Sequence, residues 1–382
     1  MSNKKRSKKI NKKRSIKKNK IKKGGKFLGR GRHGCVYGKW NEENALFKIS
    51  QTCSTNNDKN KGVKILDNHE NLLEEWESTS VIRELIEDYK KWYYIPQKKC
   101  RIERMLKEDT DENSLSPSNE SKCHFKINKN SALVLPIADY SGNQKIPEKL
   151  ETLLVAFKNL FEGISILNEN NIVHNDLKEP NVVYTIKDKK FYIIDFGHMR
   201  TFQQEGWRLA SLKDILYYHA WPFDWFFGTF LLKKIKNNNS RNVRYNYTIK
   251  ELIDNIDNIS FDYLWELFEK RFYKGKEGSP VMRGLKITDS KLNNWCEIIS
   301  KNDLQLSLSE YISLSTRKLD LWAISKCCSA IVEKNYPNVN NELVRKFNTL
   351  MESFLNPSVS KRPTAKIALD MYNKYLYEND LI

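Results

Sequence analysis

The sequence lacks any long hydrophobic run. Its most apolar stretch, residues 225–232, is far too short to span a bilayer. No apolar segment of roughly seven residues or more follows the N-terminal charges, as a signal peptide would require. The chain also lacks a CxxC pair, and its seven cysteines are odd in number and scattered. We therefore expect no transmembrane segment, no secretion and no disulfide framework, and we place the protein in a reducing, intracellular compartment.

Acidic residues are absent from the first 23 residues, which carry thirteen Lys and Arg. The whole chain has a formal charge of +19, so the remainder carries only +6. Since this segment has no apolar run that could pack, residues 1–23 are predicted to form a disordered basic arm. Such an arm can bind nucleic acid, an anionic membrane surface or import receptors, or can be a solvated tail, and the sequence leaves these readings open.

Strand-like and helix-like patterns divide the remaining chain in two. Strand signals dominate up to residue 137, interrupted by one helical pattern over residues 71–89, and a strong amphipathic helix follows at 147–170. This predicts an α+β fold with a small β-rich N-terminal lobe (24–137), a larger helical C-terminal lobe (138–380) and a cleft between them. The expected strands are residues 26–31, 35–40, 45–50, 98–105, 125–137, 182–184 and 191–194, and residues 107–122 are expected to be a polar surface loop.

A glycine-rich turn joins the first two expected strands in the pattern G-x-G-x-x-G-x-V. Glycines suit a turn that covers phosphates, because a side chain would collide with the ligand. The dinucleotide-binding fingerprint shares three of these glycines but opens a helix, whereas this segment continues as a strand. The candidate ATP-binding residues of the turn are Leu28, Gly29, Arg30, Gly31, Arg32, His33, Gly34, Cys35 and Val36.

A lysine on the third expected strand is the candidate phosphate ligand. Lys48 lies between Phe47 and Ile49, so its ammonium should be partly buried and should need phosphates and a carboxylate as partners. The competing interpretation is a surface lysine on an alternating strand. We expect its carboxylate partner on the helix at 71–89 and choose Glu75, ahead of Glu74 and Glu84.

The strongest pattern is His174-Asn175-Asp176-Leu177-Lys178-Glu179-Pro180-Asn181, followed by Asp195-Phe196-Gly197. These residues resemble the eukaryotic-type protein kinase superfamily, in its serine/threonine form. The resemblance implies transfer of the γ-phosphoryl group of ATP to protein hydroxyls. It implies that Asp176 orients the acceptor hydroxyl, that Lys178 neutralises charge on the transferred group, and that Asn181 and Asp195 hold Mg²⁺. The cofactors implied are ATP and Mg²⁺, and the implied partners are protein substrates.

Three departures from the family pattern affect regulation and architecture. Asn175 replaces the arginine that usually binds a phosphorylated activation loop, which predicts activity without that phosphorylation. No Ala-Pro-Glu is present, and Asp224 is expected to replace its glutamate as the partner of Arg362. An insertion at about 226–310 carries helix-like stretches at 247–256 and 261–272. The segment Asp320-Leu321-Trp322 resembles the helix that anchors the catalytic loop.

Alternative functions remain at this point. The Lys/Asn-rich composition and the missing Ala-Pro-Glu are similar to kinases of large DNA viruses, which implies a host cytoplasm, nucleus or virion as the location. A small-molecule kinase of the choline or aminoglycoside type shares His-x-Asp and Asn but usually lacks Lys178. A catalytically weak scaffold is disfavoured because Lys48, Asp176, Asn181 and Asp195 are all present. A nucleic-acid-binding module explains only the arm.

Overall fold

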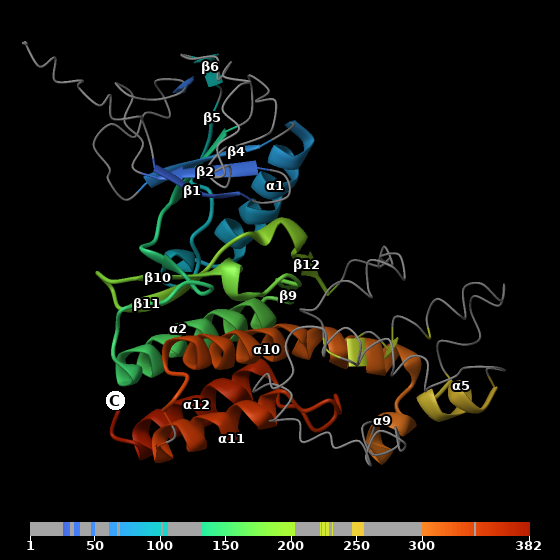
Figure 1. Ribbon diagram of the computed structural model, residues 1–382. Coiled ribbons are helices and arrows are strands. Elements are labelled where there is room, and N and C mark those ends of the chain that lie inside the picture. The colour runs from blue at the N-terminus through green and yellow to red at the C-terminus, as the bar shows by residue number, and fades with distance from the viewer. Residues whose placement is uncertain are drawn as a thin grey trace, which may run out of the picture.

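In a computed structural model of the chain, the larger sheet and one helix form the N-terminal half of the molecule, and the C-terminal half consists mainly of helices with a few short strands (Figure 1). The structure describes residues 26–30, 34–38, 47–49, 61–66, 69–100, 102–105, 132–202, 222, 224–225, 227–228, 231, 247–255, 300–339 and 341–382. The predictions for residues 1–23, 31–33, 107–122 and 261–272 lie outside these ranges. Within them, no helix combines the length and apolar character needed to span a membrane.

The N-terminal part is built on a five-stranded antiparallel sheet with the strand order β1-β2-β4-β7-β5. The middle strand β4 places Lys64 opposite Val36 on one side and Leu133 on the other. Residues directly opposite each other share a face of the sheet, so these three side chains lie on the same face. The strands are β1 (Lys26–Arg30), β2 (Gly34–Gly38), β4 (Lys61–Leu66), β5 (Lys98–Cys100) and β7 (Ala132–Pro136).

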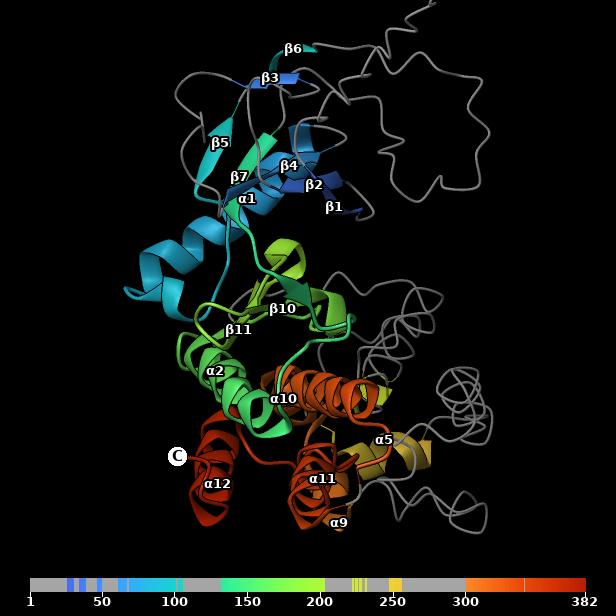
Figure 2. The same ribbon diagram turned by 60° about the vertical axis from the view of Figure 1, so that its left-hand side comes forward.

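The strand that carries Lys48 lies in a different sheet from the one expected. It is present as β3 (Phe47–Ile49), but it pairs with β6 (Ile102–Met105) in a separate two-stranded sheet. Figure 2 shows β3 and β6 together, above the five-stranded sheet. The third strand of the larger sheet is β4, which sequence reasoning did not assign. The difference arises because Phe47-Lys48-Ile49 and Val63-Lys64-Ile65 have the same local pattern, and long-range pairing decides between them.

Helix α1 (His69–Leu85) confirms the expected helix, although it ends four residues earlier. Its buried positions Leu72, Glu75, Thr79 and Ile82 recur every three or four residues and form one face. At its C-terminal end, Arg83 donates a hydrogen bond to the carbonyl of Pro96 (2.8 Å) and lies 4.2 Å from the centre of the Trp76 ring. These contacts fix the end of the helix to the loop that follows it.

The loop after α1 is anchored in the C-terminal part. The Tyr93 hydroxyl donates to the carbonyl of Gly163 on helix α2 (Leu150–Glu169) at 2.7 Å. The backbone of Ile193 on β11 (Lys190–Ile193) exchanges hydrogen bonds of 3.0 Å with Trp92 and Tyr94. Helix α1 is therefore connected to both halves of the molecule.

A helical core supports the strands that carry the candidate site. The Phe161 ring of α2 stacks on Tyr372 at 4.5 Å between centroids, and the Tyr372 hydroxyl donates to the Leu154 carbonyl. β10 pairs with β11 and with β8, above α2. The remaining elements of this part are β8 (Tyr140–Ser141), β9 (Ile172–Val173), β10 (Val182–Thr185), β12 (Arg200–Thr201), α5 (Ile249–Asn255), α9 (Lys301–Gln305), α10 (Leu308–Asn335), α11 (Glu342–Phe354) and α12 (Ala365–Glu378).

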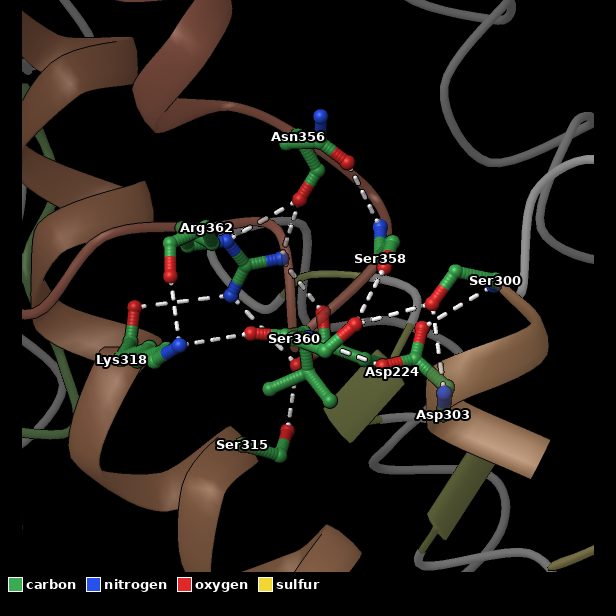
Figure 3. A network of polar contacts seen from close by, with 10 residues as sticks. Asp224, Ser300, Asp303, Ser315, Lys318, Asn356, Ser358, Ser360 and Arg362 are labelled. Atoms are coloured by element: carbon green, nitrogen blue, oxygen red, sulfur yellow. Dashed lines mark hydrogen bonds and ion pairs between the residues drawn. The ribbon is translucent and has the colours of Figure 1, made fainter. Parts of the chain in front are cut away.

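A buried ion pair connects Asp224 to Arg362, in the chain that precedes α12 (Figure 3). Arg362 lies 2.6 Å from Asp224, and both side chains are fully buried. Ser315 donates to the other oxygen of Asp224 at 2.5 Å, and Arg362 also donates to the carbonyl of Asn356. The expected Asp224–Arg362 pair is thereby confirmed. Its burial makes each charge dependent on the other.

Asp224→Ala is expected to lower the free energy of unfolding by about 3–5 kcal/mol, because it leaves the Arg362 guanidinium buried without its counterion. Urea unfolding of purified protein measures this change. The matched control is Glu378→Ala, which breaks the exposed pair with Lys374 and should cost less than about 1 kcal/mol. Equal losses in the two variants would contradict the structural role of the buried pair.

Candidate functional site

One lysine brings together the five-stranded sheet, helix α1 and the loop after β11. The Lys64 ammonium lies 2.6 Å from Glu75 Oε2 and 3.3 Å from Asp195 Oδ1. The Glu75 side chain is buried within the helix face described above, whereas the Asp195 side chain is 42% exposed. A cation held between two carboxylates, one of them open to solvent, can take a further anionic ligand on its open side.

Glu75 therefore has a lysine partner, but the partner is Lys64 and not Lys48. Lys48 lies on β3 in the separate two-stranded sheet, away from the face that Lys64 shares with Val36. This corrects the expected pairing of Lys48 with Glu75. The sequence does contain a signal for Lys64: it lies between the buried Val63 and Ile65, eleven residues before Glu75. That signal could not be told apart from the one at Lys48 by local pattern alone.

Lys64, Glu75 and Asp195 shift one another's pKa values. Burial by itself lowers the pKa of Lys64, but the carboxylates of Glu75 and Asp195 outweigh it and hold that pKa above its usual range. The Lys64 ammonium holds the pKa of Asp195 below its usual range. Burial raises the pKa of Glu75, and the Asp195 charge adds to this effect while Lys64 opposes it. Lys64 thus favours the ionised form of both acids.

A buried aspartate of α10 binds the backbone just before Asp176. Asp320 accepts hydrogen bonds from the backbone N–H groups of His174 (2.6 Å) and Asn175 (3.1 Å). Asn175 adopts a left-handed backbone (φ 64°), a conformation that its short amide tolerates. Burial raises the pKa of Asp320, and the backbone hydrogen bonds oppose this shift. The contacts fix the turn on which Asp176 lies.

Asp176 lies in a cluster with two of the other predicted site residues. Lys178 Nζ is 3.0 Å from Asp176 Oδ1, and Asn181 Nδ2 donates to Asp176 Oδ2 (3.0 Å) and to its carbonyl (2.8 Å). These bonds come from residues two and five positions further along the same turn. The cluster therefore presents a carboxylate of fixed orientation next to an ammonium, which suits the handling of a hydroxyl beside a transferred anionic group.

The orientation of the Asp195 side chain depends on Phe196, the residue that follows it. Its backbone is left-handed (φ 66°), and the next side chain, Phe196, is buried between Tyr93 and His174, with ring centroids at 5.4 Å and 4.5 Å. The ring of His174 in turn contacts the carbonyl of Ile194 at 3.0 Å. The buried phenyl ring fixes the turn, so that the Asp195 carboxylate points toward Lys64.

The donor set around Asp195 fits a hard divalent cation. Asn181 uses its amide nitrogen to contact Asp176, which leaves the amide oxygen without a hydrogen bond among the described residues. Asp195 binds Lys64 through one oxygen only. The described residues contain no group of three or more His, Cys, Asp or Glu that could hold a metal by themselves. Mg²⁺ is usually held by one or two carboxylates together with phosphates and water, so this sparse set is the kind it uses.

The strands of the glycine-rich turn are present, with Gly29 opposite Val36 and Arg30 opposite Cys35. Gly31, Arg32 and His33, at the tip of the turn, lie outside the described residues. Leu28 is 43% exposed and packs close to Gly38. Cys35 and Cys100 each form a disulfide bond, but not with each other, because β4 and β7 lie between their strands in the sheet. Cys327 and Cys328 are free. The expectation that the cysteines form no disulfides is therefore wrong for two of them.

Residues 198–202, which follow Asp195, make hydrogen bonds with residues 171–175. The Asn175 amide donates to the carbonyl of His198 at 3.3 Å, and the N–H of Phe202 donates to the carbonyl of Asn171 at 2.8 Å. Between these contacts, β12 pairs with β9. Sequence reasoning identified Asn175 only as a missing arginine, and the structure gives its amide a contact of its own.

Comparison with known proteins supports a relationship to protein kinases over part of the chain. No family model matches the chain. A curated relative is the serine/threonine-protein kinase CAK1 of Saccharomyces cerevisiae, which is 37% identical over 70 residues. The match covers 16% of this chain and 19% of that protein, so the chain matches about a fifth of its relative's length. The similarity points to the protein-kinase superfamily and to a kinase-type transferase.

Lys64→Met should raise the pKa of Asp195 and raise that of Glu75 further, because both carboxylates lose the nearby positive charge. Titration of carboxyl ¹³C signals by NMR measures both values, with Lys48→Met as the matched control. In the parent protein the folded pKa of Asp195 lies below its unfolded value. Its ionisation therefore stabilises the fold above the unfolded pKa, and this contribution is lost as the pH falls through the folded pKa. A shift in Lys48→Met of the same size would contradict the pairing.

Proposed function

We propose that this protein is an ATP-dependent protein kinase that transfers the γ-phosphoryl group to serine or threonine hydroxyls of proteins. The observation that carries the proposal is the contact of Lys64 with both Glu75 and Asp195, beside the cluster of Asp176, Lys178 and Asn181. Phosphoryl transfer needs cations and ordered acids around the phosphates more than covalent chemistry, and this group supplies both. In this proposal the N-terminal lobe is residues 24–137 and the C-terminal lobe is 138–380.

The nucleotide would lie between the five-stranded sheet and β10. We assign the phosphate contact to Lys64 in place of Lys48, with Glu75 orienting the ammonium. The glycine-rich turn would cover the phosphates from above, because Val36 shares the sheet face of Lys64. Ile137 and Ala138, which follow β7, make no backbone hydrogen bonds within the described part of the chain. Their free N–H and C=O groups support binding of a purine edge by a donor and an acceptor.

The acceptor hydroxyl would approach Asp176. Its carboxylate accepts the hydroxyl proton or orients it as the new oxygen–phosphorus bond forms and the bond to the ADP oxygen breaks. Lys178, 3.0 Å from Asp176, would neutralise charge on the transferred group. Asn181 and Asp195 would hold Mg²⁺, which when bound neutralises phosphate charge. A bound cation would also compete with Lys64 for the Asp195 carboxylate, so that the ammonium can turn toward the phosphates.

We further propose that no phosphate is needed on the segment after Asp195. In kinases that need one, an arginine before the catalytic aspartate binds it through a charge-assisted fork. Here the amide of Asn175 binds the His198 carbonyl instead, and the segment is paired through β12 and β9. The basic arm at 1–23 would act on partner choice by electrostatic attraction to anionic surfaces rather than on the chemistry.

Asp176→Ala and Asp195→Ala should each lower the rate of phosphoryl transfer by at least about 100-fold, because general acid–base and charge-stabilising groups commonly contribute this much. The assay follows label from γ-labelled ATP into casein or histone, using enzyme that has been treated with phosphatase. Acid hydrolysis of the product should release phosphoserine or phosphothreonine.

The control is Asp370→Ala, which removes an exposed carboxylate of α12 and should keep the parent rate. Folded Asp176→Ala protein with the parent rate would remove the assignment of the site. Label found mainly on phosphotyrosine would overturn the acceptor class. Inactivity of the phosphatase-treated parent, restored by rephosphorylation, would show that a phosphate orders the segment after all.

A further inference from the structure

Arg83, near the C-terminal end of helix α1, binds both its own helix and the loop that follows it. Its Nη1 donates to the carbonyl of Pro96 (2.8 Å) and to the hydroxyl of the fully buried Thr79 (3.3 Å), and its Nη2 donates to the carbonyl of Trp76 (3.4 Å). The guanidinium also lies 4.2 Å from the centre of the Trp76 ring. Hydrogen bonds and stacking together fix the plane of this group, which a lysine ammonium could not reproduce.

The acceptor carbonyl of Pro96 is itself fixed by its neighbours in the loop. The N–H of the residue after it donates to the carbonyl of Val134 on β7 (2.7 Å), and the N–H two residues before it donates to the carbonyl of Ile193 on β11 (3.0 Å). β7 pairs with β4, the strand that carries Lys64, and β11 ends two residues before Asp195. The guanidinium therefore connects α1 to the two strands that position these residues.

Glu75 lies on the same helix, eight residues before Arg83 and about 12 Å from it along the helix axis. The buried apolar positions Leu72 and Ile82 pack on the core through contacts that have no preferred direction. The hydrogen bonds of Arg83 have a direction, so they limit rotation of α1 about its axis and sliding along it. A displacement of about 1 Å in a reacting group can lower a rate roughly 100-fold, so small movements of this helix would affect the reaction.

We propose that Arg83 is a positioning residue for phosphoryl transfer, because its contact with Pro96 holds α1 where Glu75 reaches Lys64. The proposal rests on the kinase function proposed above and adds to it a residue outside the site. Without the contact, α1 can rotate or slide, the Glu75 carboxylate moves away from Lys64, and the ammonium loses its orientation toward the phosphates. Arg83 thus acts on the reaction through Glu75.

The first test is Arg83→Met, which keeps an unbranched side chain but removes every hydrogen-bond donor. Its kcat should fall at least about tenfold, while the KM for the protein substrate stays within about twofold, because substrate binding does not involve α1. Arg83→Lys keeps the charge and one donor but not the planar fork, so its kcat should be intermediate. The matched control is Arg345→Met, which removes an exposed arginine of α11 and should keep the parent kcat.

A double-mutant cycle with Glu75→Gln separates positioning from a general loss of structure. In the Glu75→Gln background Arg83→Met should lower kcat less than about twofold, because the carboxylate that Arg83 positions is already absent. Equal losses in the two backgrounds, or the parent kcat in folded Arg83→Met, would overturn this inference alone. Circular dichroism and thermal melting establish that each variant is folded, and Arg83→Lys carries the same measurements should Arg83→Met not fold.

Titration of the Glu75 carboxyl ¹³C signal gives a measurement that does not depend on turnover. The pKa of Glu75 should be higher in Arg83→Met than in the parent protein, because the carboxylate loses the nearby Lys64 ammonium, and it should be unchanged in Arg345→Met. An unchanged pKa in Arg83→Met would overturn the positioning role. A parent protein that phosphorylates no substrate would overturn the kinase function, whereas this titration would still decide whether Arg83 holds Glu75 at Lys64.

Discussion

The Lys64 ammonium holds together three parts of the chain that are far apart in sequence. Glu75 comes from α1, Asp195 from the loop after β11, and Lys64 itself from the middle strand of the five-stranded sheet. Burial alone would lower the pKa of Lys64, but the two acids outweigh this effect and hold that pKa above its usual range. The position of α1 against the sheet therefore depends on the Lys64–Glu75 ion pair, and the orientation of the Asp195 side chain depends on its ion pair with the same lysine. Movement of the helix would separate Glu75 from Lys64 and leave a buried carboxylate without its partner.

The helical half provides a rigid base for this group. Asp320 accepts hydrogen bonds from the backbone N–H groups of His174 and Asn175, and the Phe196 ring lies between His174 and Tyr93. Tyr93 is itself bonded to α2. A continuous set of contacts thus runs from α10 through residues 174–196 to the loop that follows α1. The two carboxylates of the proposed reaction, Asp176 and Asp195, are positioned by elements that also bury the core.

Local patterns were sufficient for some parts of the site and insufficient for others. The resemblance carried by residues 174–181 and 195–197 implied that these residues share a site. The pairing of Asp224 with Arg362 followed from the positions of the two residues relative to these motifs. The choice between Lys48 and Lys64 depended on which strand enters the larger sheet. Local sequence cannot tell which of two short strands with the same alternation of polar and apolar residues enters the larger sheet, because this depends on the strands with which each one pairs. The disulfide bonds of Cys35 and Cys100 were missed for a related reason, since cysteine spacing carries no information on which side chains meet.

In the proposed kinase, Lys64 contacts the phosphates of a bound nucleotide. A nucleotide acyl phosphate tests it directly, because the amine nearest the phosphate attacks the acyl carbonyl, forms a stable amide and releases the nucleotide. After labelling of the full chain, tryptic peptides analysed by mass spectrometry should carry the acyl group on Lys64, and excess ATP with Mg²⁺ should prevent the labelling. Labelling on Lys48 that ATP prevents, with Lys64 unmodified, would show that Lys48 and not Lys64 contacts the phosphates.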